Sequence, residues 1–130
     1  MNGDIHPDDV AFSLELDAIA FTLSEEYGLD LRILEHKRRP YQYSAYGHFY
    51  LSDRRISITL RYKVRAYQAR ISGIKWYPEP LDEFQVLDTL AHELAHARYF
   101  DHSKRHKAFT AELEPLVRGM WVAMQRKEAS

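Results

Sequence analysis

The stretch LAHELAHA, residues 90–97, decides the fold of this 130-residue chain, because it carries the pattern H-E-x-x-H inside an apolar helical segment. Residues four apart on a helix share one face, with Cβ atoms about 5–6 Å apart. His92 and His96 can therefore bind one Zn²⁺ ion, at roughly 2.0–2.1 Å per Zn–N bond. Glu93 is rotated away from both histidines and can act as a general base on water at the metal. The motif predicts a zinc site with Glu93 as its catalytic residue.

The residues around the motif predict a helix from Leu81 to Phe100. Asp82, with Gln85 three residues later, forms a capping-box pattern at its start. The buried side is predicted to consist of Leu87, Leu90, Ala91, Leu94 and Ala95. A plain solvated helix face has no use for two histidines beside such an apolar wall. We therefore favour metal binding over the alternative of ordinary surface or core histidines.

A catalytic zinc ion needs a third protein ligand and an open position for water. The next histidines along the chain are His102 and His106. A helix that ran straight past Phe100 would point both away from the face of His96, so the chain is predicted to turn near residues 100–101. His102 then lies at the turn and is the favoured third ligand. His106 is the alternative third ligand; otherwise it supports the site from outside, faces the substrate or is exposed.

The sequence before the motif predicts one helix and several strands. The helix is expected from about residue 8 to residue 27 and ends at Gly28. Its apolar stripe is predicted to consist of Val10, Leu14, Ala18 and Phe21. β-Strands are predicted within residues 29–35, 41–51 and 56–61, arranged as an antiparallel meander, and residues 62–80 have no clear pattern.

After the motif, a last helical region begins near Ser103 and carries Phe109, Leu113, Leu116 and Val117. Pro115 is expected to kink or split it. The order of elements indicates an α+β fold over a single domain, residues 1–130. In this fold a small antiparallel or mixed sheet packs on the helix of the motif, with one helix at each end of the chain.

The composition excludes several classes of protein. The chain has no cysteine, which rules out disulfides, a cysteine nucleophile and a thiolate metal site. The N-terminus lacks a basic region followed by an apolar run, so no signal peptide is expected. No stretch approaches the roughly 20 apolar residues that span a bilayer. We therefore expect a soluble, cytoplasmic protein with no membrane partner.

Basic residues are concentrated between residues 32 and 75, although the net charge of the chain is −1. They are Arg32, Lys37, Arg38, Arg39, Arg54, Arg55, Arg61, Lys63, Arg65, Arg70 and Lys75, opposed by Glu35 and Asp53. Tyrosines and phenylalanines are interleaved with these charges, a combination that suits single-stranded DNA. The alternative is that the aromatic residues pack in the core while the charges form a solvated face.

The sequence HELAH at residues 92–96, followed by His102-Ser103 and Phe109, resembles the motif of the SprT-like and WLM-type zinc metallopeptidases. The strand sequence at residues 56–60 and the approach to the motif at 87–90 are also similar to SprT-like domains. The resemblance covers about residues 40–115. SprT-like proteins often carry a C-terminal cysteine zinc ribbon, which this chain lacks.

This resemblance implies a zincin-like fold with Zn²⁺ as the cofactor. It implies that His92, His96 and His102 are the metal ligands and that Glu93 is the catalytic glutamate. Family members include proteases that degrade proteins crosslinked to DNA, which would fit the basic, aromatic segment. Tyr99 occupies the place of the helix-ending glycine of metzincins, which argues against assignment to that group.

The chain is therefore predicted to be a zinc-dependent peptidase that hydrolyses peptide bonds of protein substrates, including proteins bound or crosslinked to DNA. Glu93 would take a proton from water and pass it to the leaving amine. Several tyrosines could stabilise the oxyanion, and the sequence does not distinguish among them. Two alternatives remain: a regulatory protease that cuts one repressor-like partner, and a catalytically inactive zinc-binding or nucleic-acid-binding module.

Overall fold

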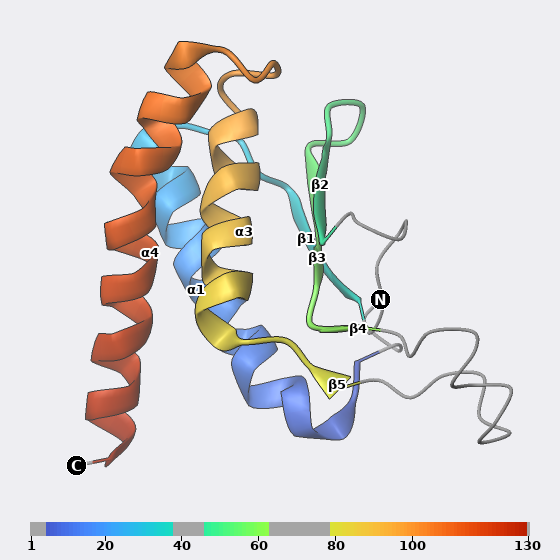
Figure 1. The fold of residues 1–130 in the computed structure, drawn as a ribbon, viewed down its shortest axis with the longest axis vertical. Coiled ribbons are helices and arrows are strands. Elements are labelled where there is room, and N and C mark those ends of the chain that lie inside the picture. The colour runs from blue at the N-terminus through green and yellow to red at the C-terminus, as the bar shows by residue number, and fades with distance from the viewer. Residues whose placement is uncertain (1–4, 38–45, 63–78, 130) are drawn as a thin grey trace, which may run out of the picture.

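A computed structural model describes residues 5–37, 46–62 and 79–129 of the chain. Its elements are η1 (Pro7–Asp9), α1 (Val10–Tyr27), β1 (Ile33–Lys37), β2 (Gly47–Tyr50), β3 (Arg55–Thr59), β4 (Arg61–Tyr62), β5 (Glu79–Pro80), α3 (Glu83–His96) and α4 (Lys104–Ala129). Helix α3 lies between α4 and the sheet, and α1 packs on both α3 and α4 (Figure 1). The predicted α+β fold, with a small sheet packed on the helix of the motif, is confirmed.

Helix α1 follows one 3-10 turn and has nearly the predicted bounds, but its predicted apolar stripe is wrong. Val10, Leu14 and Phe21 are exposed, with Leu14 at 62%. The buried face consists of Ser13, Leu16, Ile19, Ala20, Leu23 and Ser24. The two serines tolerate burial because their hydroxyls find local partners. The Ser13 hydroxyl donates to the Val10 carbonyl at 2.7 Å, and Ser24 Oγ accepts from the Leu31 N–H at 2.9 Å.

The three-stranded sheet is mixed, with the strand order β1-β3-β2. Strand β3 pairs in parallel with β1 and antiparallel with β2. The predicted antiparallel meander is therefore wrong, since β1 and β2 lie on opposite edges of the sheet. Strand β1 also begins later than predicted, at Ile33, because Asp30 adopts a φ of 55° in the loop that follows α1. Strands β2 and β3 both contact α3.

The predicted apolar side of α3 is confirmed. Its buried apolar residues are Val86, Leu87, Leu90, Ala91, Leu94 and Ala95, which share one core with α1, β3 and α4. The helix spans Glu83–His96 and is shorter at both ends than the predicted 81–100. Asp82 is the N-cap residue, but its side chain makes no cap hydrogen bond, so the capping-box prediction is wrong.

Helix α4 is continuous through Pro115, so the predicted split is wrong. The residues predicted on it were Phe109, Leu113, Leu116 and Val117, of which all but Leu116 are buried. A proline in a helix removes the hydrogen bond to the carbonyl four residues earlier, here that of Ala111. Pro115 and Ala111 both lie on the exposed side of α4. Water can therefore reach the unpaired carbonyl, and the helix continues.

Candidate metal centre and adjacent cleft

Helix α3 carries His92, Glu93 and His96 in its last two turns. His92 is half-buried, whereas Glu93 and His96 are only 6% and 8% exposed. The helix ends at His96. The Ala97 N–H donates at 3.1 Å to the carbonyl of Leu94, three residues earlier, as in a 3-10 turn. The turn that His102 requires therefore begins at Ala97, earlier than the predicted residues 100–101.

The segment after α3 brings His102 back to the helix. Asp101 Oδ1 accepts from the Ser103 N–H at 3.3 Å, and Ser103 Oγ accepts from the His106 N–H at 3.4 Å. Polar side chains at these two positions stabilise the turn and the start of α4. His102 lies in this connection, exposed to solvent.

The Nε2 atom of His96 lies close to the Nε2 atoms of two other histidines. His96 Nε2 lies 3.2 Å from His92 Nε2 and 3.2 Å from His102 Nε2. His96 Nδ1 lies 3.0 Å from the carbonyl oxygen of Tyr99. A carbonyl oxygen can only accept, so the proton of His96 is on Nδ1 and a lone pair is on Nε2. The Nε2 atom of His96 thus has a lone pair available for a metal ion.

The two separations measured from His96 Nε2 suit a zinc ion. Two nitrogens bound tetrahedrally at the usual Zn–N distance lie about 3.3 Å apart. The 3.2 Å separations agree with this value. Neutral imidazoles without thiolates are also a donor set that zinc accepts. Burial, followed by the nearby histidines, lowers the pKa of His92 to about 4, and burial lowers the pKa of His96. Both rings are therefore held in the neutral form that binds metals.

His106 belongs to the same cluster through different contacts. Ligand atoms of His92, His96 and His106 all lie within 4.8 Å of one another, so this group, in which His102 is absent, could hold a metal ion. The His106 Nε2 atom, however, lies 3.1 Å from the backbone carbonyl oxygen of His92. The structure therefore brings all four histidines together and gives His102 and His106 different surroundings.

Glu93 is a buried carboxyl group beside this cluster. Burial raises its pKa from 4.5 to about 7. Strand β2 approaches it so closely that a Cβ atom on Gly47 would lie 3.0 Å from Glu93 Cγ and 2.6 Å from Thr89 Cγ2. Only glycine fits at that position. The sequence carried one signal of this approach, a lone glycine among strand residues, which often marks close backbone packing.

A cleft of about 610 Å³ opens along α3 beside His92 and Glu93. Its lining residues are Tyr46, Gly47, Asp82, Phe84, Gln85, Asp88, Thr89, His92, Glu93 and Arg118. Arg118 and Asp88 form a two-pronged ion pair at one side, with distances of 2.6 and 2.8 Å. Among the tyrosines whose side chains the structure describes, Tyr46 lines this cleft. The cleft leaves His92 and Glu93 accessible from solvent.

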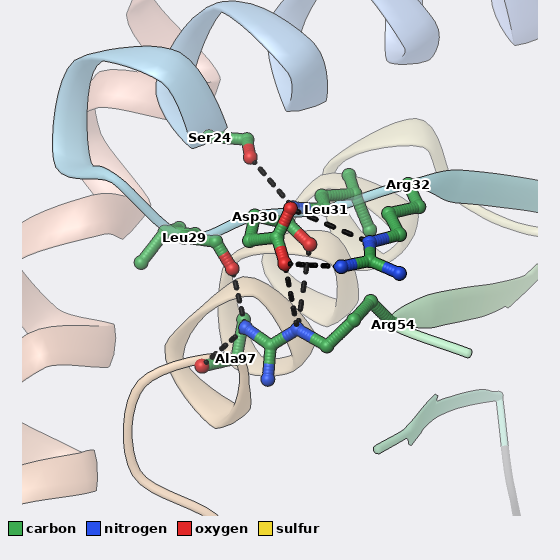
Figure 2. Close-up of polar contacts among 7 residues, drawn as sticks. All are labelled: Ser24, Leu29, Asp30, Leu31, Arg32, Arg54 and Ala97. Carbon is green, nitrogen blue, oxygen red and sulfur yellow. Dashed lines mark hydrogen bonds and ion pairs between the residues drawn. The ribbon is translucent and has the colours of Figure 1, made fainter. Parts of the chain in front are cut away.

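Arg54 anchors the end of α3 to the rest of the fold. Its guanidinium donates to the carbonyl oxygens of Leu29, Asp30 and Ala97, the last two at 3.3 and 3.0 Å (Figure 2). It therefore ties the loop after α1 to the residue that follows His96. No motif in the sequence pointed to this residue, because its three acceptors are backbone atoms distant in sequence.

The basic segment 32–75 lies partly outside the described residues. Its described basic side chains have internal partners: Arg32 pairs with Asp30, Arg55 with Asp53 and Glu35, Arg61 with Asp9 and Lys37 with Glu35. These contacts agree with a structural use of the charges in this part of the segment. No helix in the described part of the chain has an apolar stretch that could cross a lipid bilayer.

Comparisons with known proteins give one similarity of fold. No family model matches the sequence, and no curated protein matches it. The structure is similar to the crystal structure of Wss1 from Saccharomyces cerevisiae, with a TM-score of 0.61 and 20% sequence identity. The match covers 87% of this chain and 77% of the Wss1 chain. At this level of identity the likeness establishes the fold alone, which this chain shares with that structure.

Proposed function

We propose that this chain is a zinc-dependent peptidase, in which His92, His96 and His102 hold Zn²⁺ and Glu93 is the general base. The observation that carries the proposal is the buried Glu93 carboxyl group, which lines a cleft beside His92, with the Nε2 atoms of His92 and His102 each 3.2 Å from that of His96. Burial makes this carboxyl group costly to ionise, and a carboxyl group with a perturbed pKa in a cleft is a candidate for a chemical role. The Wss1-like fold supports the WLM-type resemblance drawn from the sequence.

The division of labour follows from the surroundings of each residue. When bound, zinc supplies a Lewis acid that polarises the scissile carbonyl and makes nearby water more acidic. Glu93 takes the proton of the attacking water and passes it to the leaving amine. A pKa raised by burial toward neutrality suits a group that must both accept and release a proton. Strand β2 is an edge strand that lines the cleft, so it can hold an extended substrate by strand addition.

The test replaces the base and leaves the histidines unchanged. Glu93→Gln is expected to keep stoichiometric zinc and to lose about 10²–10⁴-fold in cleavage rate of an unfolded protein substrate such as casein. Glu83→Gln makes the same chemical change on the exposed first turn of α3 and should leave the rate unchanged. Cleavage by the Glu93→Gln protein at the unmodified rate would refute the assignment of the base.

We further propose that proteins bound or crosslinked to DNA are substrates. The support is the basic, aromatic segment 32–75, together with the family resemblance. Single-stranded DNA is expected to accelerate cleavage of a DNA-bound protein, and replacing Arg38 and Arg39 by alanine should reduce that acceleration. A rate independent of DNA, with cleavage confined to one protein partner, would favour the regulatory-protease alternative instead.

A further inference from the structure

We infer that His106 is a positioning residue, which holds the metal-binding imidazoles in place through its Nε2–H group and is not itself a ligand. The inference rests on the proposed metal site of His92, His96 and His102. It assigns a role to the fourth histidine of the cluster, which is 1% exposed and is the most deeply buried of the four.

The hydrogen bond of His106 determines which of its nitrogens is free. Its Nε2 atom lies 3.1 Å from the backbone carbonyl oxygen of His92. Because a carbonyl oxygen has no hydrogen to give, the hydrogen of this bond is on the histidine Nε2. A nitrogen that carries a hydrogen has no lone pair for a metal. Coordination through Nε2 would therefore require this buried hydrogen bond to break. The lone pair on Nδ1 is free, but the His106 ring is stacked on the His96 ring, with centroids 3.8 Å apart and planes inclined by 19°. A metal ion lies close to the plane of each imidazole that binds it, so one ion cannot be bound by both of these stacked rings.

The ring of His106 also packs against the rings of both histidines of the motif. It stacks on the His96 imidazole with ring centroids 3.8 Å apart and an angle of 19° between the planes. It meets the His92 ring edge-on, at 4.5 Å and 81°. These contacts explain why ligand atoms of the three residues lie within 4.8 Å of one another without requiring that all three bind one ion.

The hydrogen bond from His106 to the His92 carbonyl also holds the connection in which His102 lies. His102 lies in the connection between α3 and α4, and His106 lies in the first turn of α4, four residues later. Bonding from His106 to the His92 carbonyl ties the start of α4 to the middle of the motif. At the other end of the connection, Tyr99 accepts a hydrogen bond from His96. The exposed His102 side chain therefore depends on anchors on both sides of it.

The experiment compares two amides that reach different positions in the full-length protein. The amide nitrogen of Gln can replace imidazole Nε2 as a donor, whereas the shorter Asn reaches only the Nδ1 position. Zinc affinity, measured by competition with a chromogenic chelator, is expected to fall about 10–100-fold in His106→Asn. In His106→Gln it should stay within a few-fold of the wild-type value. His102→Gln serves as the ligand control and should lose zinc outright.

A second readout needs no metal. The imidazole ¹⁵N spectrum of the metal-free protein should show His106 protonated at Nε2, and zinc addition should leave its nitrogens without the shift expected of a ligand. The inference is overturned if Asn preserves affinity better than Gln, if both variants bind as tightly as the wild type, or if both lose zinc as completely as His102→Gln. Failure of the proposed function is separate: it appears as cleavage that survives Glu93→Gln while zinc binding stays intact.

Discussion

The close approach of strand β2 to the part of α3 that carries Glu93 leads to a quantitative prediction for Gly47→Ala. A Cβ atom at this position would lie 2.6 Å from Thr89 Cγ2 and 3.0 and 3.1 Å from Cγ and Oε2 of Glu93. Thr89 cannot easily rotate away, because its hydroxyl donates to the Gln85 carbonyl at 2.9 Å and a β-branched side chain is stiff in a helix. Overpacking of this kind costs about 1–3 kcal/mol in the free energy of unfolding.

A double-mutant cycle isolates the contact responsible. Thr89→Ser removes Cγ2 but keeps the hydroxyl, so Gly47→Ala should be less destabilising in that background. The expected coupling energy is about 0.5–3 kcal/mol. The contacts with Glu93 remain in the double mutant, so peptidase activity should stay reduced, by up to about a hundredfold, even where stability recovers.

The measurement is urea unfolding followed by tryptophan fluorescence, with zinc-dependent cleavage measured on the same proteins. Gly119→Ala is the matched control, since a Cβ there meets no atom within 4 Å and the residue lies inside helix α4. That control is expected to stabilise the protein by about 0.4–1 kcal/mol. A Gly47→Ala protein with wild-type stability and activity, or a coupling energy near zero, would refute the steric argument.

Three further predictions concern residues around the site and in the core. Burial holds the pKa of His36 below its usual value. Between about pH 6.5 and that lower pKa, the unfolded chain therefore binds more protons than the folded chain. The free energy of unfolding should fall as the pH is lowered through this range. The carboxylate of Asp17 lies 3.0 Å from His36 Nε2 and favours the charged ring, so Asp17→Asn should steepen this fall. Urea unfolding at pH 7.5 and at pH 5.5 measures the change, and an unchanged pH dependence would contradict the argument. Arg54→Met leaves three backbone carbonyl groups without their donor and should lower the free energy of unfolding by about 1–3 kcal/mol. Arg54→Lys should be intermediate, because one ammonium group cannot reach all three acceptors. Equal stability of the wild type and both variants would contradict the role of Arg54 as an anchor. Tyr46→Phe is expected to lower kcat about 10²–10³-fold with KM and zinc content unchanged if its hydroxyl stabilises the oxyanion, whereas Tyr50→Phe, outside the cleft, should have no effect.

The parts of the fold that the sequence predicted well are those determined by local patterns. The apolar side of α3 was predicted correctly because its polar and apolar residues are segregated around the helix. Helix α1 has apolar residues on both faces, so periodicity identified a helix but not its buried side. Small residues decided that side: Ser13 and Ser24 allow close packing and satisfy their hydroxyls within a few residues.

The sheet order could not be derived from the sequence for a different reason. Whether β2 returns beside β1 or crosses to the far edge of β3 depends on the connection between them and on which edge can cover α3. Alternation of side chains reports neither. The consequence is functional, since the edge position of β2 places Gly47 against Glu93 and creates one wall of the cleft.

The candidate metal centre also depends on both local and distant determinants. Spacing on one helix was enough to group His92, His96 and Glu93, and the need for a turn was enough to favour His102. What distinguishes His102 from His106 is a hydrogen bond to a backbone carbonyl 14 residues away in sequence, and no side-chain pattern encodes such an acceptor. Arg54 follows the same rule, since its partners at Leu29 and Ala97 are also carbonyl groups. Motif searches therefore miss residues that support this site through backbone acceptors, although they find the motif histidines that those residues hold in place.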